Sequence, residues 1–244
     1  MSTFLAEARQ TLMPRDEVKH GPLPPLLVAM TLVTGLVDAL SYLVLGHVFV
    51  ANMTGNVVFL AFALAGAPGF SILASLVALG SFVLGSFGGG LLGSRLGQHR
   101  GHLLSIAAAL QALFLCTGVV LAALAGNPAQ AGYSYGLIIV LGIAMGLQNA
   151  TARKLAVPDL TTTVLTLTIV GIAADSRPVG GSGSRAGRRL IAVAAMFVGA
   201  LVGSLLIFHV AIVLPLVIAL IVIAVIAGTT QLLSRTDPDW VHAS

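Results

Sequence analysis

The sequence GLVDALSYLVLGHVFVANMTGNVVFLAFALAG, residues Gly35 to Gly66, contains two apolar runs separated by the small and polar residues ANMTGN. The first run begins upstream, near Leu26, is long enough to cross a bilayer, and contains Asp38. The second run is too short to cross unaided. A charged side chain at the centre of a transmembrane helix costs roughly 2.5–3.5 kcal/mol on insertion scales. Asp38 is therefore a candidate functional residue.

The composition of the chain is that of an integral membrane protein. Of its 244 residues, 57% are hydrophobic and 8% are charged, and the mean hydropathy is +1.04. Soluble domains carry about 25% charged residues, so this chain lacks the residues for an ordinary water-facing surface. Several apolar segments of roughly 20 residues match a bilayer core about 30 Å thick. These features predict an all-α, polytopic transmembrane helical bundle.

A single integral membrane domain is expected over residues 26–233. A polar N-terminal segment, residues 1–25, precedes it, and a polar tail, residues 234–244, follows it. The formal net charge of +4 comes from basic residues in short connections beside apolar runs, where such residues set the orientation of a membrane protein. We therefore expect a lipid bilayer as the surroundings and no nucleic-acid partner.

Two parts of the sequence resemble each other. GLVDA at 35–39 matches GLQNA at 146–150 in spacing and character, and NMTGN at 52–56 parallels DLTTT at 159–163. Each copy consists of a span, a polar break, a short apolar piece and two further spans. Such internal similarity is typical of duplicated transporter folds.

The distribution of basic residues favours six full crossings. If the two broken segments enter and leave the membrane on the same side, every basic cluster lies in the cytoplasm, as the positive-inside rule requires. Each half, about residues 26–125 and 133–233, then crosses three times, so the halves are inverted relative to each other and both termini are cytoplasmic. The alternative is seven or eight crossings, and with eight the repeat is parallel.

The polar breaks are the candidate sites, because non-helical backbone survives at membrane depth only where protein or water satisfies it. Asn52 and Asp159 each precede a threonine by two residues, so we expect them to cap the short helices that follow. The positive N-terminal ends of those helices would approach the midplane from opposite faces, near Asp38 and Asn149 in one cavity. The residues expected to line a solute path are Asp38, Asn52, Thr54, Asn56, Asn149, Asp159 and Thr161.

Simpler roles are open for the same residues. Asn52 and Asp159 can be helix caps and nothing more, and the threonines can hydrogen-bond to helix carbonyls. Asp38 can be a structural hydrogen-bond hub, or it can take up and release a proton during transport.

Signatures of other chemistry are missing from the sequence. The Gly- and Ser-rich stretch Asp175–Arg189 lacks the preceding strand and the following Lys-Ser/Thr of a phosphate-binding loop, so we expect a flexible connection there. His47 and His209 are isolated, and neither a paired-histidine helix motif nor a nucleophile elbow occurs. We therefore expect no enzymatic activity, no cofactor and no metal site.

The repeated regions resemble the two signature regions of the YoaK-type family of bacterial inner-membrane proteins. In the first, Gly-x-x-Asp-Ala is followed by Phe-x-x-x-Met-Thr-Gly-Asn, which runs from Phe49 to Asn56. In the second, Gly-Leu-Gln-Asn-Ala at 146–150 and Pro-Asp-Leu-Thr-Thr-Thr at 158–163 are intact, and the likeness covers about Leu26 to Leu233. The resemblance implies a multi-span protein of the bacterial cytoplasmic membrane, in a family defined by a domain of unknown function. It assigns no substrate and no functional residues.

The sequence favours a transporter or channel for a small polar solute, with coupling to protons through Asp38 left open. The alternative is a non-transporting membrane scaffold or assembly protein, in which the polar residues only hold helices together. Either function is compatible with a homo-oligomer, and the sequence specifies neither the substrate nor the direction of transport.

Overall fold

The computed structural model of the chain describes residues 2–13, 19–125, 131–160, 162, 165–174, 186–236 and 238–242. Thr161, one of the predicted path residues, lies outside the described residues. So does the part of the predicted flexible connection between residues 175 and 185, whereas Arg188 and Arg189 belong to a helix.

Six helices in the described part are long and apolar enough to cross a membrane. They are α2 (Leu23–Val44), α4 (Ile72–Leu96), α5 (Arg100–Leu124), α6 (Ala131–Leu155), α8 (Ala186–His209) and α9 (Leu214–Leu233). Two others, α3 (Met53–Leu64) and α7 (Leu165–Ala174), are too short, because a crossing needs about 20 residues. The prediction of an all-α bundle with six full crossings and two short segments is confirmed.

The first span begins three residues earlier than the sequence predicts. The predicted start was near Leu26, after the run GPLPP at residues 21–25, but α2 begins at Leu23 and contains Pro24 in its first turn. Proline is tolerated there because the first helical N–H groups have no intrahelical acceptor. The same residues therefore start the helix instead of delaying it.

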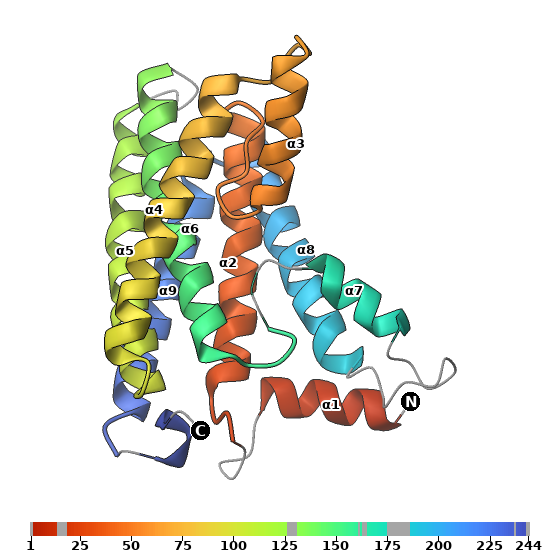
Figure 1. Ribbon diagram of the computed structural model, residues 1–244, viewed down its shortest axis with the longest axis vertical. Coiled ribbons are helices and arrows are strands. Elements are labelled where there is room, and N and C mark those ends of the chain that lie inside the picture. Colours follow the sequence, from red (N-terminus) through yellow and green to blue (C-terminus); the bar gives the residue numbers. More distant parts are fainter. Residues whose placement is uncertain are drawn as a thin grey trace.

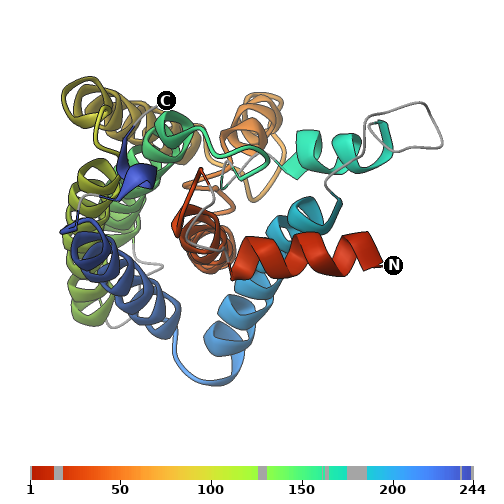
Figure 2. The ribbon, with the colours of Figure 1, turned by 90° about the horizontal axis from the view of Figure 1, so that it is seen from below.

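Two short elements lie at one end of the bundle. The helix α1 (Ser2–Leu12) packs across α8 (Figures 1 and 2), and the 3-10 turn η2 (Asp239–Val241) follows α9. Trp240 of η2 is buried, and its ring lies against Gly21, whose φ is +45°, and against Gly101. The chain after α9 is thus anchored to the starts of α2 and α5.

The spanning helices pack in matched pairs. α2 packs along α8 and α4 along α6, while α5 packs along α6 and α2 along α9. Suppose that α2, α3, α4 and α5 are equivalent to α6, α7, α8 and α9, in that order. The pair α2–α8 then corresponds to α6–α4, and the pair α5–α6 corresponds to α9–α2. Figure 1 shows that α2 begins at the end of the bundle where α1 lies and that α6 ends there. The two halves therefore run in opposite directions.

Glycines allow the closest of these approaches, and they occur at equivalent places. A Cβ added to Gly35 of α2 would lie 2.7 Å from the backbone nitrogen of Ala200 in α8. A Cβ added to Gly146 of α6 would lie 2.8 Å from the backbone nitrogen of Ser86 in α4. The facing glycines, at which a side chain would also overlap the opposite helix, are Gly199 and Gly203 against Leu32 and Leu36, and Gly85 and Gly89 against Ile143 and Leu147. The internal repeat stays a prediction, and these matched contacts support it.

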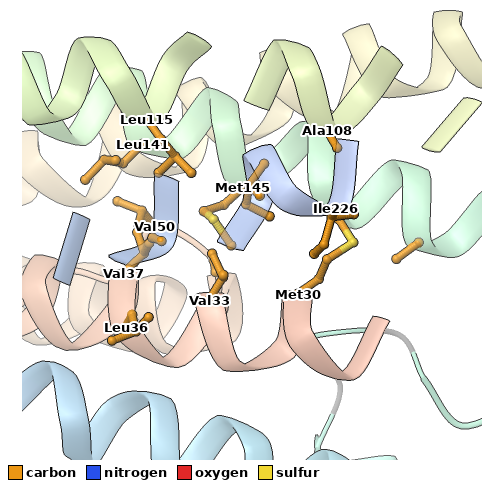
Figure 3. Packing of buried hydrophobic residues seen from close by; sticks show 14 of the residues in the cluster. Met30, Val33, Leu36, Val37, Val50, Ala108, Leu115, Leu141, Met145 and Ile226 are labelled. Atoms are coloured by element: carbon orange, nitrogen blue, oxygen red, sulfur yellow. The ribbon is translucent and has the colours of Figure 1, made fainter. Parts of the chain in front are cut away.

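A continuous apolar core joins α2 to α5, α6 and α9. Figure 3 shows Val33 and Val37 of α2 on the side that faces Met145 of α6. Val50, which belongs to no helix, lies beside Val37 in this core and is fully buried. The chain between α2 and α3 thus enters the interior of the bundle, where its backbone N–H and C=O groups need protein partners.

Candidate functional site

The first break, residues 45–52, is folded back into the bundle. Gly46 (φ 95°) and His47 (φ 57°) have left-handed backbone conformations that turn the chain after α2. Val48, Val50 and Ala51 are then buried. The break has no helical hydrogen-bond ladder here, so side chains must satisfy its backbone.

Asp38 accepts hydrogen bonds from two backbone N–H groups of the break. Its Oδ1 accepts the backbone N–H groups of Val50 and Ala51, both at 3.0 Å, and its Oδ2 accepts a hydrogen bond from Nδ2 of Asn52. The Asp38 side chain is buried in α2, and the described residues that donate hydrogen bonds to its carboxylate carry no charge. Asp38 is thus a hydrogen-bond hub with three neutral donors.

Asn56 holds the same break from the other side. Its Oδ1 accepts the N–H of Phe49 at 2.8 Å, and its Nδ2 donates to the Phe49 carbonyl at 2.5 Å. Asn56 is fully buried, in the first turn of α3. Thr54, two residues before it on the same helix, is exposed. The two predicted path residues in α3 therefore face in different directions.

An aromatic cluster closes the end of the break. The rings of Tyr42 and Phe49 are stacked with centroids 5.1 Å apart, and those of Phe59 and Phe70 are stacked at 5.3 Å. His47 Nδ1 lies 2.9 Å from the carbonyl oxygen of Gly69. These contacts tie the break to α2, α3 and the start of α4, and they make its position well defined.

The second break differs from the first. After α6 ends at Leu155, Ala156 (φ 50°) and Asp159 (φ 64°) turn the chain. The Asp159 carboxylate forms an ion pair with Arg189 of α8, with Nε and Oδ1 at 2.9 Å. It lies six residues before the start of α7, too far to cap that helix.

The prediction that the side chains of Asn52 and Asp159 cap the short helices after them is therefore wrong. Asn52 does occupy the residue before α3, yet its side chain makes no capping hydrogen bond, because its amide is engaged by Asp38. In each break a long-range partner has replaced the local acceptor role that the sequence suggested.

Asn149 is the counterpart of Asp38 in the second half. It lies six residues before the end of α6, as Asp38 does in α2, and its Nδ2 donates to the carbonyl of Met145 at 2.9 Å. Because α2 and α6 end at opposite ends of the bundle (Figure 1), the two residues lie in opposite halves of the membrane-spanning region. Among the described residues that line the cavity beside Asp38, Asn149 is not included.

A cavity of about 370 Å³ lies between α2, the first break, α7 and α8. Asp38 and Asn52 are in its wall, next to the aromatic pair Tyr42 and Phe49. Thr166, in the first turn of α7, reaches it from the other short segment. The remaining lining residues are small, apolar or hydroxylic, namely Gly35, Ala39, Leu43, Met196, Ala200 and Ser204.

The interior also contains a polar network that the sequence reasoning missed. Gln111 of α5 donates to Gln148 of α6 at 2.6 Å, and Gln148 donates in turn to Thr34 of α2 at 2.9 Å. All three are buried. The one feature of the sequence that could have indicated this network is Gln148, an amide side chain in an apolar span beside Asn149.

Arg100 is a second missed residue. It is buried at the start of α5, where its guanidinium donates to the carbonyl of Leu155 at 2.5 Å and lies 3.1 Å from His20 Nδ1. It therefore caps the C-terminal end of α6. In the sequence alone it is one of the basic residues in short connections, where such residues set orientation. Within the described ranges, no group of three or more His, Cys, Asp or Glu side chains is placed to hold a metal ion.

The chain has recognisable relatives. The family described as protein of unknown function (DUF1275) matches residues 26–229. A transmembrane protein of Bacillus subtilis (strain 168), named UPF0700 transmembrane protein YoaK, is 36% identical over 154 residues. That alignment covers 62% of this chain and 65% of the relative, so the chain spans just under two thirds of the relative's length. No solved structure is significantly similar to this chain. With the family match extending over all six spanning helices, this chain is a multi-pass membrane protein that belongs to the DUF1275 family, as the resemblance to YoaK-type proteins had implied.

Proposed function

We propose that this protein is a transporter or channel for a small polar solute, and that the solute passes through the cavity beside Asp38. The observation that carries the proposal is the buried carboxylate in the wall of a 370 Å³ cavity to which both short segments contribute residues. Intramembrane carboxylates are costly and mark substrate or ion pathways in many transporters. Broken helices of inverted halves commonly surround the substrate in such folds.

The charge pattern supports an orientation for the proposed transporter, and the family resemblance supports a location. We place the protein in the bacterial cytoplasmic membrane with both termini in the cytoplasm. The basic residues at the end of α4, the end of α6, the start of α8 and after α9 lie at the end of the bundle where α1 lies (Figure 1). The positive-inside rule assigns that end to the cytoplasm.

The test is a flux measurement with a variant that removes charge but keeps shape. Asp38→Asn retains an oxygen for the Val50 and Ala51 N–H groups, and rotation of the Asn52 amide restores the third hydrogen bond. We expect wild-type protein in liposomes to pass solutes from a panel of small polar compounds faster than empty liposomes. Asp38→Asn should reduce that flux to background with its unfolding temperature unchanged.

A control variant separates the effect of charge from the effect of location. Asp239→Asn changes the formal charge equally, but Asp239 is exposed on the tail, so its flux should equal that of the wild type. Equal flux through Asp38→Asn and wild-type protein would remove Asp38 from the path.

A second candidate function has support from a specific observation. The hydrogen bonds of Asp38 all go to the first break, which is what a purely structural hub would make. In a scaffold or assembly protein, Asp38→Asn would lower the unfolding temperature or the yield, and no solute in the panel would cross. The same pair of measurements, flux and thermal stability, therefore distinguishes the two functions.

A further inference from the structure

We propose that the cavity beside Asp38 binds an organic cation, an ammonium group attached to a compact apolar body. This inference rests on the proposed function, since it names the class of solute that the same cavity would take. It starts from the charge of the cavity wall. Among the described residues that line the cavity, Asp38 is the one carboxylate, and none is a lysine, arginine or histidine.

Within the part of the chain that the structure describes, the hydrogen bonds of Asp38 give its negative charge no counter-ion. Three N–H donors point at the carboxylate, two at Oδ1 and one at Oδ2. All three are neutral, so they orient the group without cancelling its charge. Each carboxylate oxygen has about two acceptor positions, so Oδ2, with one donor, is the oxygen left open to a cation. A buried carboxylate is stabilised when the charge of a cation lies next to it.

The aromatic pair gives the second half of the argument. Tyr42 and Phe49 are half-buried, stacked on each other, and in the wall of the same cavity. Aromatic faces attract ammonium groups, and quaternary ammonium ligands are recognised in this way. A carboxylate and two aromatic rings around one space are a poor site for an anion, which both would repel.

The remaining lining sets the shape of the ligand. Leu43, Met196 and Ala200 are apolar, and Ser204 already donates its hydroxyl hydrogen to the Ala200 carbonyl at 2.8 Å. Few free donors and acceptors therefore face the cavity. A polyhydroxylated neutral solute would give up more hydrogen bonds with water than it could form with the cavity wall. A cation with an apolar body loses little.

The test measures binding, separately from transport, on the purified full chain in a neutral detergent. The probe is benzyltrimethylammonium, with neopentylbenzene as its uncharged isostere and phenylacetate as an anion of similar size. Isothermal titration calorimetry should show saturable binding of the cation and of neither control compound. Asp38→Asn should weaken binding of the cation by about tenfold or more, and Asp239→Asn should leave it unchanged.

The aromatic contribution has its own matched pair. Tyr42→Phe keeps the ring and should keep the affinity, whereas Tyr42→Leu should weaken binding by about threefold to tenfold. If Asp38→Asn fails to fold, the comparison of Tyr42→Phe with Tyr42→Leu still tests whether the cavity binds the cation. Equal binding to wild-type protein and Tyr42→Leu, or preference for phenylacetate over the cation, would overturn the inference.

The outcome is distinguishable from that of the flux experiment. Saturable, Asp38-dependent binding of the cation in a protein that passes no solute would support the binding site and remove the transport function. Flux of neutral solutes in a protein that does not bind the cation would support transport and overturn the cation site.

Discussion

Asn56 is the residue whose role changed most between sequence and structure. Its side chain pairs with both the N–H and the C=O of Phe49 and is fully buried, so it acts as a substitute for a missing backbone partner. We predict that Asn56→Ala lowers the free energy of unfolding by about 2–4 kcal/mol, because two buried backbone groups lose their partner at about 1–3 kcal/mol each. Thermal unfolding in detergent measures this loss.

Thr54→Ala is the matched control for that measurement. Thr54 is exposed on the same helix, so its replacement should change the free energy by no more than about 0.5 kcal/mol. If the two variants unfold at the same temperature, the first break is not held by Asn56.

The polar residues of the breaks could be identified from the sequence, whereas the residues with which they form hydrogen bonds or ion pairs could not. Asp38 and Asn52 were both predicted, and they meet in one cavity wall. Their bond to each other was not predicted, because residues fourteen positions apart become neighbours only when the chain folds back after α2. The ion pair of Asp159 with Arg189 has the same cause, since Arg189 follows a stretch that gives no local signal. Local capping rules assume that no stronger distant partner exists.

At the scale of helices, glycines set how closely α4 and α6 approach. A Cβ on Gly85 would overlap the backbone of Ile143, whereas a Cβ on Gly90 of the same helix would meet nothing within 4 Å. We predict that Gly85→Ala destabilises the protein by about 1–3 kcal/mol, because the backbones must separate. Gly90→Ala should be neutral or stabilising by up to about 1 kcal/mol.

The same experiment tests the repeat. Gly199 of α8 faces Leu32 of α2 as Gly85 faces Ile143, so Gly199→Ala should cost about as much as Gly85→Ala. Unfolding temperatures of the three variants provide the comparison. A large loss at Gly85 with none at Gly199 would mean that the two helix pairs are not equivalent.

Helix number and length were predictable because a bilayer makes hydrophobic length decisive. The short segments α3 and α7 stood out for the same reason. Helix packing was predictable only in outline. The glycines of α4 and α8 are visible in the sequence, but the choice of α6 and α2 as their partners depends on the whole arrangement. The missed network around Gln148 joins three different helices, which no local pattern can indicate.

At the scale of the whole molecule, the orientation in the membrane decides which side the cavity serves. With Cys116 replaced by serine, Gln98→Cys places a thiol in the exposed connection between α4 and α5, and Ala65→Cys places one at the exposed end of α3. These connections lie at opposite ends of the bundle (Figure 1). A membrane-impermeant maleimide applied to intact cells should label position 65 and leave position 98 unlabelled until the cells are permeabilised.

The reverse pattern would keep the fold but turn the protein over, so that the basic residues would face outward and Asp38, six residues from the end of α2, would lie in the cytoplasmic half. Labelling of both positions in intact cells would contradict the six crossings, because α4 alone lies between the two positions and a single crossing puts them on opposite sides of the membrane. The expected pattern instead places Asp38 in the outer half of the membrane. A cation taken from outside would then meet the carboxylate early in its passage, so external benzyltrimethylammonium should inhibit flux in cells more strongly than the same probe enclosed on the cytoplasmic side of liposomes.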